Sequence, residues 1–396
     1  MIPYSRQSIT EADINAVVEA LKGDILTAGE IVDKFEAALA NYVGTKHAVV
    51  LNSATSALHA LYLAIGLKSG DEIVTTPITF AATANAALMA GADVRWADIK
   101  FNGNIDPQKI SAAITPCTKA IVAVDLGGAP VDIAPLYEIA KKHGIALLND
   151  ASHALGSSYG DEAAAWAKQN SLYHAEKSEK NPKVGSLALA SVFSFHPIKP
   201  ITTLEGGAVL TNDDDIATKV RLLRSHGITK RTAWDSQMQS LGYNYRLSDV
   251  ACALGLSQLG RLDEMIARRN EIANFYDDKF KNNHYFSTPM LKAGEISSRH
   301  LYPILLHPHM HCAKQELYDR LKEAGIITQV HYKPTYKFEL YRAKYGEIEL
   351  KNAEEFYKAE LSIPCHQGMS DDEAKFVAST ILKLCQKLDT SGCKVR

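Results

Sequence analysis

The sequence predicts an α/β fold, in which a mainly parallel sheet covered by helices on both faces is followed by a smaller α+β domain. Short apolar segments alternate with amphipathic segments through the first half of the chain. Near residue 256 this pattern gives way to longer helical segments. The chain has 396 residues, enough for two domains. We therefore expect a large domain with an N-terminal arm at residues 1–255 and a small domain at residues 256–396.

The first elements follow from helix start and stop signals. Thr10 can cap a helix over residues 10–20, because Asp13 stands three residues further on. A second helix covers residues 31–42 and ends at Gly44. The alternating part predicts helices at residues 53–65, 79–90 and 133–143, and strands at residues 48–51, 72–75, 93–96, 120–125, 146–149, 191–195 and directly after Gly207.

Two later regions break the alternation. Residues 161–183 are polar and carry both charge signs, so we expect an exposed excursion that is helical between residues 162 and 169. Beyond it, the small domain is expected to hold one long helix at residues 256–280, a strand at 299–306, and helices at 313–324 and 371–387.

Composition excludes several classes of protein. The formal net charge is −2, which does not suit a partner that is a nucleic acid or an anionic membrane. No apolar stretch is long enough to span a bilayer, and residues 1–6 lack the pattern of a signal peptide. The six cysteines show no spacing typical of a zinc site or a disulfide framework. We expect a cytoplasmic enzyme without a metal site.

Lys199 lies in the most informative stretch of the chain. It follows an apolar strand and precedes the Gly206-Gly207 step into another. Lysine is rarely buried unless it is paired or reactive, and burial lowers its pKa, which makes it a nucleophile able to form a Schiff base with an aldehyde. A surface lysine in a loop at the end of a strand is the alternative from this segment alone.

Three further segments carry chemical signals. The segment 52–58 opens a helix after a strand, so its first N–H groups and the hydroxyls of Thr55 and Ser56 can bind a phosphate, unless Ser53 is an ordinary N-cap. Asp150, after a strand, can pair with a protonated pyridine nitrogen or merely cap the next segment. His153 can contact a ring hydroxyl or be structural. Phe80 can stack on an aromatic cofactor or belong to the core.

Pyridoxal 5′-phosphate (PLP) is the ligand that needs all of these groups together. Its phosphate, ring face, pyridine nitrogen and aldehyde match the segment at Ala54 and Thr55, Phe80, Asp150 and Lys199 respectively. The glycine patterns of dinucleotide and P-loop sites are absent from the sequence. The residues therefore predict a PLP enzyme.

The chain resembles the DegT/DnrJ/EryC1/StrS family of sugar aminotransferases, which have the fold-type I, aspartate aminotransferase-like architecture. Within it, the Ser-Phe-His-Pro-Ile-Lys run at 194–199 and the Val-His-Tyr-Lys-Pro run at 330–334 are most similar to the pseudaminic acid branch. The matching segments follow the family order and cover nearly the whole chain: residues 2–7, 26–29, 52–59, 79–85, 150–153, 193–199, 205–207, 226–230, 242–246, 330–332 and 361–367.

The resemblance implies a role for each matching residue. Lys199 would carry the cofactor and Asp150 would pair with its ring nitrogen, so these two are the expected catalytic residues. The other cofactor-binding residues would hold the phosphate, stack on the ring, stand near the ring hydroxyl or reach the phosphate of a neighbouring subunit. These are Ala54, Thr55 and Ser194 for the phosphate, Phe80 for stacking, His153 for the hydroxyl, and Asn244 from the neighbour.

The same resemblance implies the reaction and its partners. It predicts transfer of an amino group from L-glutamate to C4 of UDP-4-keto-6-deoxy-N-acetyl-β-L-altrosamine by a homodimer with shared active sites. A pyrophosphate needs cations and donors, so candidates for binding the nucleotide sugar, unless they are loop surface, are Tyr4, Lys230, Arg231, His331 and Tyr332.

The sequence departs from the family pattern at three places, and the last two could line the substrate side. Asn149 replaces an acidic residue, residues 124–130 differ from the usual motif, and residues 161–183 are longer than usual. The alternatives are aminotransferases for UDP-linked D-sugars, 3-aminotransferases for dTDP-sugars, or a regulatory protein that binds PLP without turnover. Lys199 disfavours the related sugar 3-dehydratases, which have histidine there.

Overall fold

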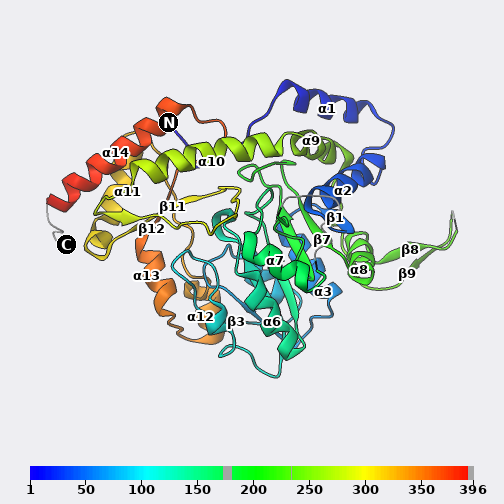
Figure 1. The fold of residues 1–396 in the computed structure, drawn as a ribbon. Coiled ribbons are helices and arrows are strands. Elements are labelled where there is room, and N and C mark those ends of the chain that lie inside the picture. Colours follow the sequence, from blue (N-terminus) through cyan, green and yellow to red (C-terminus); the bar gives the residue numbers. More distant parts are fainter. Residues whose placement is uncertain (173–180, 233, 391–396) are drawn as a thin grey trace.

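The computed structural model describes residues 1–172, 181–232 and 234–390. Figure 1 shows a large part that contains the main sheet and a smaller part built around α10, α11 and α14, with a thin hairpin projecting from the large part. Across these described residues, no helix combines the length and the apolar character needed to cross a membrane.

The main sheet has seven strands in the order β1-β7-β6-β5-β4-β2-β3. Neighbouring strands from β6 to β3 pair in parallel, whereas β7 is antiparallel to both β6 and β1. The predicted, mostly parallel sheet of the large domain is therefore confirmed. The strands are β1 (His47–Leu51), β2 (Glu72–Thr75), β3 (Asp93–Trp96), β4 (Thr118–Val124), β5 (Ala146–Asp150), β6 (Ala190–Ser194) and β7 (Gly207–Thr211).

Helices cover both faces of this sheet, because side chains of each strand point alternately to either face. In β4, Ile121 and Ala123 face one apolar cluster, while Ala120 and Val122 face the other. The first cluster contains side chains of α2 (Glu30–Val43), α6 (Ile133–His143) and α9 (Asp249–Leu259). The second contains those of α3 (Ala54–Ala64), α4 (Ala82–Met89) and α8 (Asp214–Arg224).

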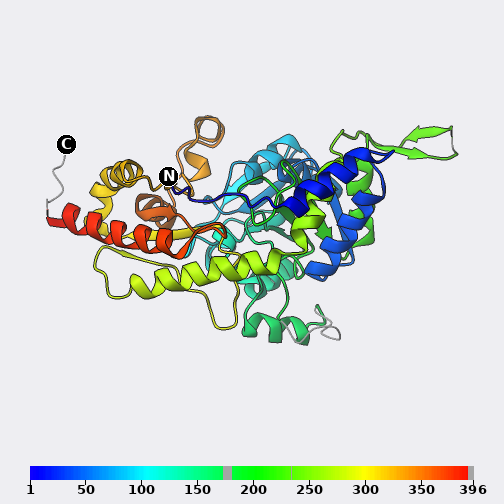
Figure 2. The same ribbon diagram turned by 90° about the horizontal axis from the view of Figure 1, so that it is seen from above.

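The N-terminal arm runs from the small part to the large part (Figure 2). At its start, Ile2 forms a parallel bridge with Ile326. It then enters α1 (Glu11–Lys22), where Thr10 and Asp13 form the predicted capping box. Asp13 also bonds to Arg261 and Ser257, which ties α1 to the region of α9.

The small part has its own apolar cluster and an antiparallel sheet in the order β10-β11-β12. The division of the chain into two domains at residue 256 remains a prediction. Residue 256 itself lies inside α9. The elements are α10 (Leu262–Lys279), β10 (Phe286–Ser287), β11 (Tyr302–Leu306), α11 (Lys314–Glu323), α12 (Glu339–Tyr345), α13 (Lys351–Ala359), β12 (Glu360–Ile363) and α14 (Asp371–Thr390), with short helical turns at Pro308–Ala313 and Thr335–Lys337.

The prediction of one long helix over residues 256–280 was wrong. Two helices occupy this region, α9 and α10, with the break at Gly260 and Arg261. Glycine weakens a helix, and Arg261 leaves the helical conformation with φ −122° while its guanidinium donates to Ser8 O and Asp13. The change of direction thus coincides with the attachment of the N-terminal arm.

The region that was predicted to be an excursion begins as expected with a helix, α7 (Asp161–Gln169). Its stretch at residues 173–180 lies outside the described residues. Elsewhere, α5 (Pro107–Ile110) is a single turn and the projecting hairpin consists of β8 (Ile228–Lys230) and β9 (Ser236–Met238).

Candidate functional site

The site lies at the edge of the main sheet where its parallel strands end. Asp150 is the last residue of β5, and Ser194 is the last of β6. Ser194 is paired in register with Gly207, and Gly207 with Leu51 at the end of β1. This edge therefore brings together the segments that the sequence singled out, as open α/β sheets commonly do for their ligands.

Asp150 is a buried carboxylate, 5% exposed, that is held by hydroxyl groups. Its Oδ2 accepts a hydrogen bond from Thr83 Oγ1 at 2.7 Å, and its Oδ1 accepts one from Ser152 Oγ at 2.6 Å. Thr83 is in turn hydrogen-bonded to Thr79. Among the described residues no cation forms a salt bridge with Asp150. A buried carboxylate without a cation is costly, so the site suits a positively charged partner.

Lys199 lies in the loop after β6, with its side chain half-buried. Burial lowers the pKa of Lys199 to about 7, and the negative charge of Asp150 opposes part of this effect. Its Nζ lies 3.3 Å from His300 Nε2. Burial, reinforced by Lys199, holds the pKa of His300 well below its usual range, so the imidazole is neutral. Lys199 is therefore available as a neutral amine near pH 7.

His153 is a neutral imidazole whose tautomer follows from its neighbours. Burial holds its pKa well below the usual range, with Lys199 and His331 adding to the effect. The Gly127 N–H donates to Nδ1 at 3.2 Å, so the ring hydrogen is on Nε2, which faces Tyr332 Oη at 3.2 Å. Tyr332 thereby accepts from His153 and keeps its own hydroxyl hydrogen for another acceptor.

The N-terminus of α3 forms an anion cradle next to the end of β6. Ala54 and Thr55 occupy its first turn, where backbone N–H groups have no partner within the helix. A Cβ on Gly207 would come within 2.6 Å of Ala54 N, so only glycine permits this approach. The hydroxyl of Ser56 was expected to point at the ligand, but it instead closes the capping box with Ser53.

Aromatic side chains form another wall of the site. The ring of Phe80, just ahead of α4, is 62% exposed and its centroid lies 6.3 Å from that of Tyr332. His331 stands between Tyr332 and Tyr4, with its ring centroid 5.3 Å from that of Tyr4. The structure thus brings three of the five predicted substrate residues, namely Tyr4, His331 and Tyr332, close to one another.

The remaining predicted residues lie elsewhere. Lys230 ends β8, and the exposed Arg231 follows it on the hairpin that projects away from the rest of the chain (Figures 1 and 2). Asn244 is exposed, and its backbone carbonyl accepts from Asn52 Nδ2 at 3.2 Å. Within one chain, the hairpin does not bring Lys230 and Arg231 to Lys199.

The departures from the family pattern lie behind and beside the site. Asn149 points to the opposite face of β5 from Asp150 and lies near Asp125 and Tyr159. Burial raises the pKa of Asp125 to about 7, so an acid at position 149 would add a second costly carboxyl group. A second departure, at residues 124–130, contains Gly127, whose N–H sets the tautomer of His153.

Several site residues were not singled out from the sequence. Thr83 and Ser152, whose hydroxyls donate to Asp150, lie within the motifs at residues 79–85 and 150–153. These motifs were therefore the sequence signal for both residues. His300, which touches Lys199, lies in no recognisable motif. The strand predicted at 299–306 begins only at Tyr302, because Arg299 adopts φ 48°. This irregular turn precedes His300.

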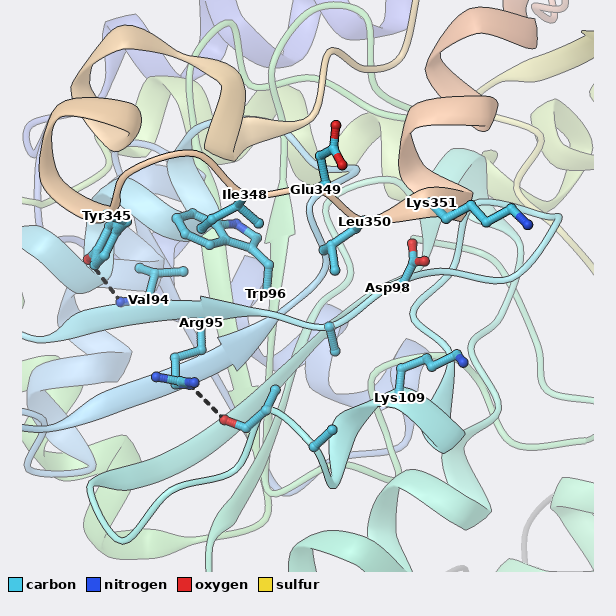
Figure 3. A pocket seen from close by; sticks show the side chains of 13 residues that line it. Val94, Arg95, Trp96, Asp98, Lys109, Tyr345, Ile348, Glu349, Leu350 and Lys351 are labelled. Carbon is cyan, nitrogen blue, oxygen red and sulfur yellow. Dashed lines mark hydrogen bonds between the residues drawn. The ribbon is translucent and has the colours of Figure 1, made fainter.

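A separate cavity of about 650 Å³ lies at the outer edge of the sheet (Figure 3). Strand β3 contributes Arg95 and Trp96, and the segment after α12 contributes Glu349 and Leu350. Tyr345 donates to Asp93 Oδ1 and also accepts from the Val94 N–H, which fixes this segment against β3. None of the predicted site residues lines this cavity.

The arrangement at the sheet edge fits the cofactor that the sequence predicts. It offers a half-buried amine, a buried carboxylate without a salt bridge to a described residue, a cradle of free N–H groups and an exposed aromatic face. The corresponding residues are Lys199, Asp150, Ala54 with Thr55 and Ser194, and Phe80. Asp150 would satisfy a protonated pyridine nitrogen, and the cradle would hold a phosphate.

Comparison with known proteins agrees with this geometry. A Campylobacter jejuni (strain 81-176) protein named UDP-4-amino-4,6-dideoxy-N-acetyl-beta-L-altrosamine transaminase is 54% identical over 99% of this chain and 100% of its own. The solved structure of Helicobacter pylori PseC, an aminotransferase involved in the biosynthesis of pseudoaminic acid, superposes with TM-score 0.91 at 43% identity, covering 98% of this chain and all of that one. The PLP-form of Spr1654 from Streptococcus pneumoniae has TM-score 0.88 at 28% identity, covering 98% and 99%.

The family comparison covers nearly the whole chain. Residues 7–382 match the DegT/DnrJ/EryC1/StrS aminotransferase family. The resemblance that the motifs indicated is thereby confirmed, and so is the aspartate aminotransferase-like fold. The chain belongs to the DegT/DnrJ/EryC1/StrS aminotransferase family.

Proposed function

We propose that the protein is a PLP-dependent aminotransferase that transfers an amino group from L-glutamate to C4 of UDP-4-keto-6-deoxy-N-acetyl-β-L-altrosamine, a step of pseudaminic acid biosynthesis. The observation that carries the chemistry is the half-buried Lys199 near Asp150, a buried carboxylate that forms no salt bridge with any described residue. The full-length similarity to the Campylobacter jejuni transaminase supports the choice of sugar.

Besides Lys199, residues of the sheet edge would hold the cofactor at three points. Ala54, Thr55 and Ser194 would bind its phosphate, and Phe80 would stack on its ring. Asp150 would keep the ring nitrogen protonated, with Thr83 and Ser152 fixing the carboxylate. When bound, PLP supplies an electron sink for the carbon that carries the amino group.

Lys199 would bind the cofactor through Nζ and, once released, would move a proton. Because burial lowers its pKa to about 7, the free amine can accept a proton from the substrate carbon and return it. His300 Nε2 lies 3.3 Å from Nζ and offers it a neutral acceptor, so the ammonium form is oriented without another positive charge beside it. In the first half of the reaction glutamate becomes 2-oxoglutarate, and in the second the keto sugar becomes the amino sugar.

The nucleotide sugar would lie against the wall of Tyr4, His331 and Tyr332, and cations would come from a second copy of the chain. Lys230 and Arg231 are on a hairpin that leaves its own site, next to Trp234 at 88% exposure and Met238 at 70%. Large apolar side chains so exposed favour burial in an interface. We therefore include the shared-site homodimer, with Asn244 reaching the neighbouring cofactor, in the proposal.

The direct test offers the purified protein UDP- and dTDP-linked 4-keto-6-deoxy sugars with L-glutamate and identifies each product by NMR. We expect amination of the altrosamine-type ketone, and none if Lys199→Ala replaces the wild type. Amination of another sugar only would contradict the choice of substrate. Several turnovers by Lys199→Ala would contradict the role of Lys199.

A further inference from the structure

The buried carboxyl group of Glu360 lies directly behind His331. Glu360 is the first residue of β12 and is completely buried. Its Oε2 accepts the backbone N–H of His331 at 2.6 Å, and its Oε1 accepts the hydroxyl of Ser362 at 2.6 Å. Burial raises the pKa of Glu360 to about 7, while the bonds from Ser362 and His331 and the charge of Lys314 on α11 favour its ionised form. The reaction outlined above does not use this group.

A chain of hydrogen bonds connects Glu360 to the His331 ring. Ser362 Oγ lies 2.8 Å from His331 Nδ1. An ionised Glu360 carboxylate can only accept, so it takes the single hydroxyl hydrogen of Ser362, and Ser362 then accepts from the imidazole. The ring hydrogen of His331 is therefore on Nδ1.

The opposite nitrogen of His331 is then a hydrogen-bond acceptor. Burial lowers the pKa of His331 to about 3, and the positive charge of Lys199 adds to the effect, so the ring is neutral. A neutral ring with its hydrogen on Nδ1 has a lone pair on Nε2. Within the described part of the chain Nε2 has no hydrogen-bond partner, and it is not a buried atom.

We propose that Glu360, acting through Ser362, is a positioning residue that holds His331 as an acceptor at Nε2 for an O–H or N–H group of the sugar. This inference rests on the proposed function. It changes the role expected for His331, because a neutral acceptor repels the oxygens of a pyrophosphate and instead selects a donor on the substrate. The free hydroxyl hydrogen of Tyr332 complements it with a donor next to the acceptor.

Replacing Glu360 with glutamine tests the inference without changing the size of the side chain. The glutamine amide oxygen must accept the His331 N–H, so its NH₂ group faces Ser362. Ser362 then accepts from Gln and donates to His331 Nδ1, which moves the ring hydrogen to Nε2. In ¹⁵N-histidine-labelled protein, with the signal assigned by His331→Asn, the Nδ1 and Nε2 resonances should exchange their protonated and unprotonated shifts.

In Glu360→Gln, the KM for the keto sugar should change, whereas the KM for the amino donor should not. We expect the KM for the keto sugar to rise about tenfold to a hundredfold in Glu360→Gln, as for an unpaired polar contact, with the KM for glutamate within twofold of wild type. Ser362→Ala removes the hydroxyl that connects Glu360 to the His331 ring. In the double variant, Glu360→Gln should therefore have little further effect on the KM for the sugar. Thermal unfolding and cofactor absorbance monitor folding in each variant.

Several outcomes would overturn the inference. An unchanged His331 tautomer in Glu360→Gln would do so, and so would a reversed tautomer with an unchanged KM for the sugar. If Glu360→Gln does not fold, Ser362→Ala tests the inference. In this variant His331 should lose its fixed Nδ1–H tautomer and the KM for the keto sugar should rise; if either change is missing, the inference is wrong. The tautomer of His331 is measured without substrate. If the wild type aminates no sugar, the proposed function is contradicted, whereas the tautomer measurement still tests the link between Glu360 and His331.

Discussion

The ionisation of Lys199 gives a quantitative prediction for the protein without cofactor. Burial lowers the pKa of Lys199 to about 7, so about half of the amine is neutral at pH 7. An exposed lysine with a pKa of about 10.4 is neutral in only ~0.04% of molecules at that pH. The reactive form of Lys199 should therefore be about a thousandfold more abundant than that of an exposed lysine.

The perturbation that tests the cause of this shift is Asp150→Asn. The carboxylate of Asp150 favours the ammonium form and opposes the effect of burial. Removing its charge should therefore lower the pKa of Lys199 below that of the wild type, so the neutral amine appears at a lower pH. The cofactor-free protein should still fold, because asparagine has nearly the same shape.

The assay is trace acetylation of the cofactor-free protein between pH 5 and 10, followed by mass spectrometry of the peptide that contains Lys199. Exposed lysines of the same chain are the internal reference. Limited access to Lys199 changes the absolute rate but not the pH midpoint, so the midpoint is the quantity to compare. A wild-type midpoint above about 9, or an upward shift in Asp150→Asn, would refute the reasoning.

Three further predictions concern the cradle, the carboxylate and the core. Gly207→Ala should weaken PLP binding at least tenfold, measured by fluorescence titration, because its Cβ would meet Ala54 N at 2.6 Å; unchanged affinity would argue against the cradle. Thr83→Val should lower kcat about tenfold by releasing one oxygen of Asp150, and a kcat equal to wild type would contradict that support. Arg269→Ala should lower the free energy of unfolding by about 3–5 kcal/mol in urea titrations, since the buried guanidinium donates to the carbonyls of Arg299 and Cys365; a loss below ~1 kcal/mol would contradict this.

Much of the sheet and the centre of the site could be predicted because their signals are local. Most strands are short apolar runs that alternate with helices, Asp150 ends one of these runs, and Lys199 lies in the loop after another. The capping box at Thr10 needed only residues close together in sequence. Local signals did not predict the break at Gly260, because the amphipathic pattern continues across it. Arg261 stabilises the break by bonding to Ser8 and Asp13, which are far away in the sequence.

The rest of the site depends on contacts between residues far apart in the chain. His300 meets Lys199 across 101 positions, and Glu360 meets His331 across 29, without a periodicity or motif that links them. The position of Lys230 and Arg231 could not be read from residue type either, because a hairpin carries them away from Lys199. Their distance from the site within one chain is the physical reason for proposing that the site is shared between two subunits.

The central claim is tested most directly by incubating the purified protein with PLP, L-glutamate and UDP-4-keto-6-deoxy-N-acetyl-β-L-altrosamine, and following both products. The account predicts one 2-oxoglutarate for each UDP-4-amino sugar formed, with the new amino group on C4 by NMR. Release of 2-oxoglutarate without an amino sugar, or no reaction with this ketone when another nucleotide-linked keto sugar is aminated, would contradict it.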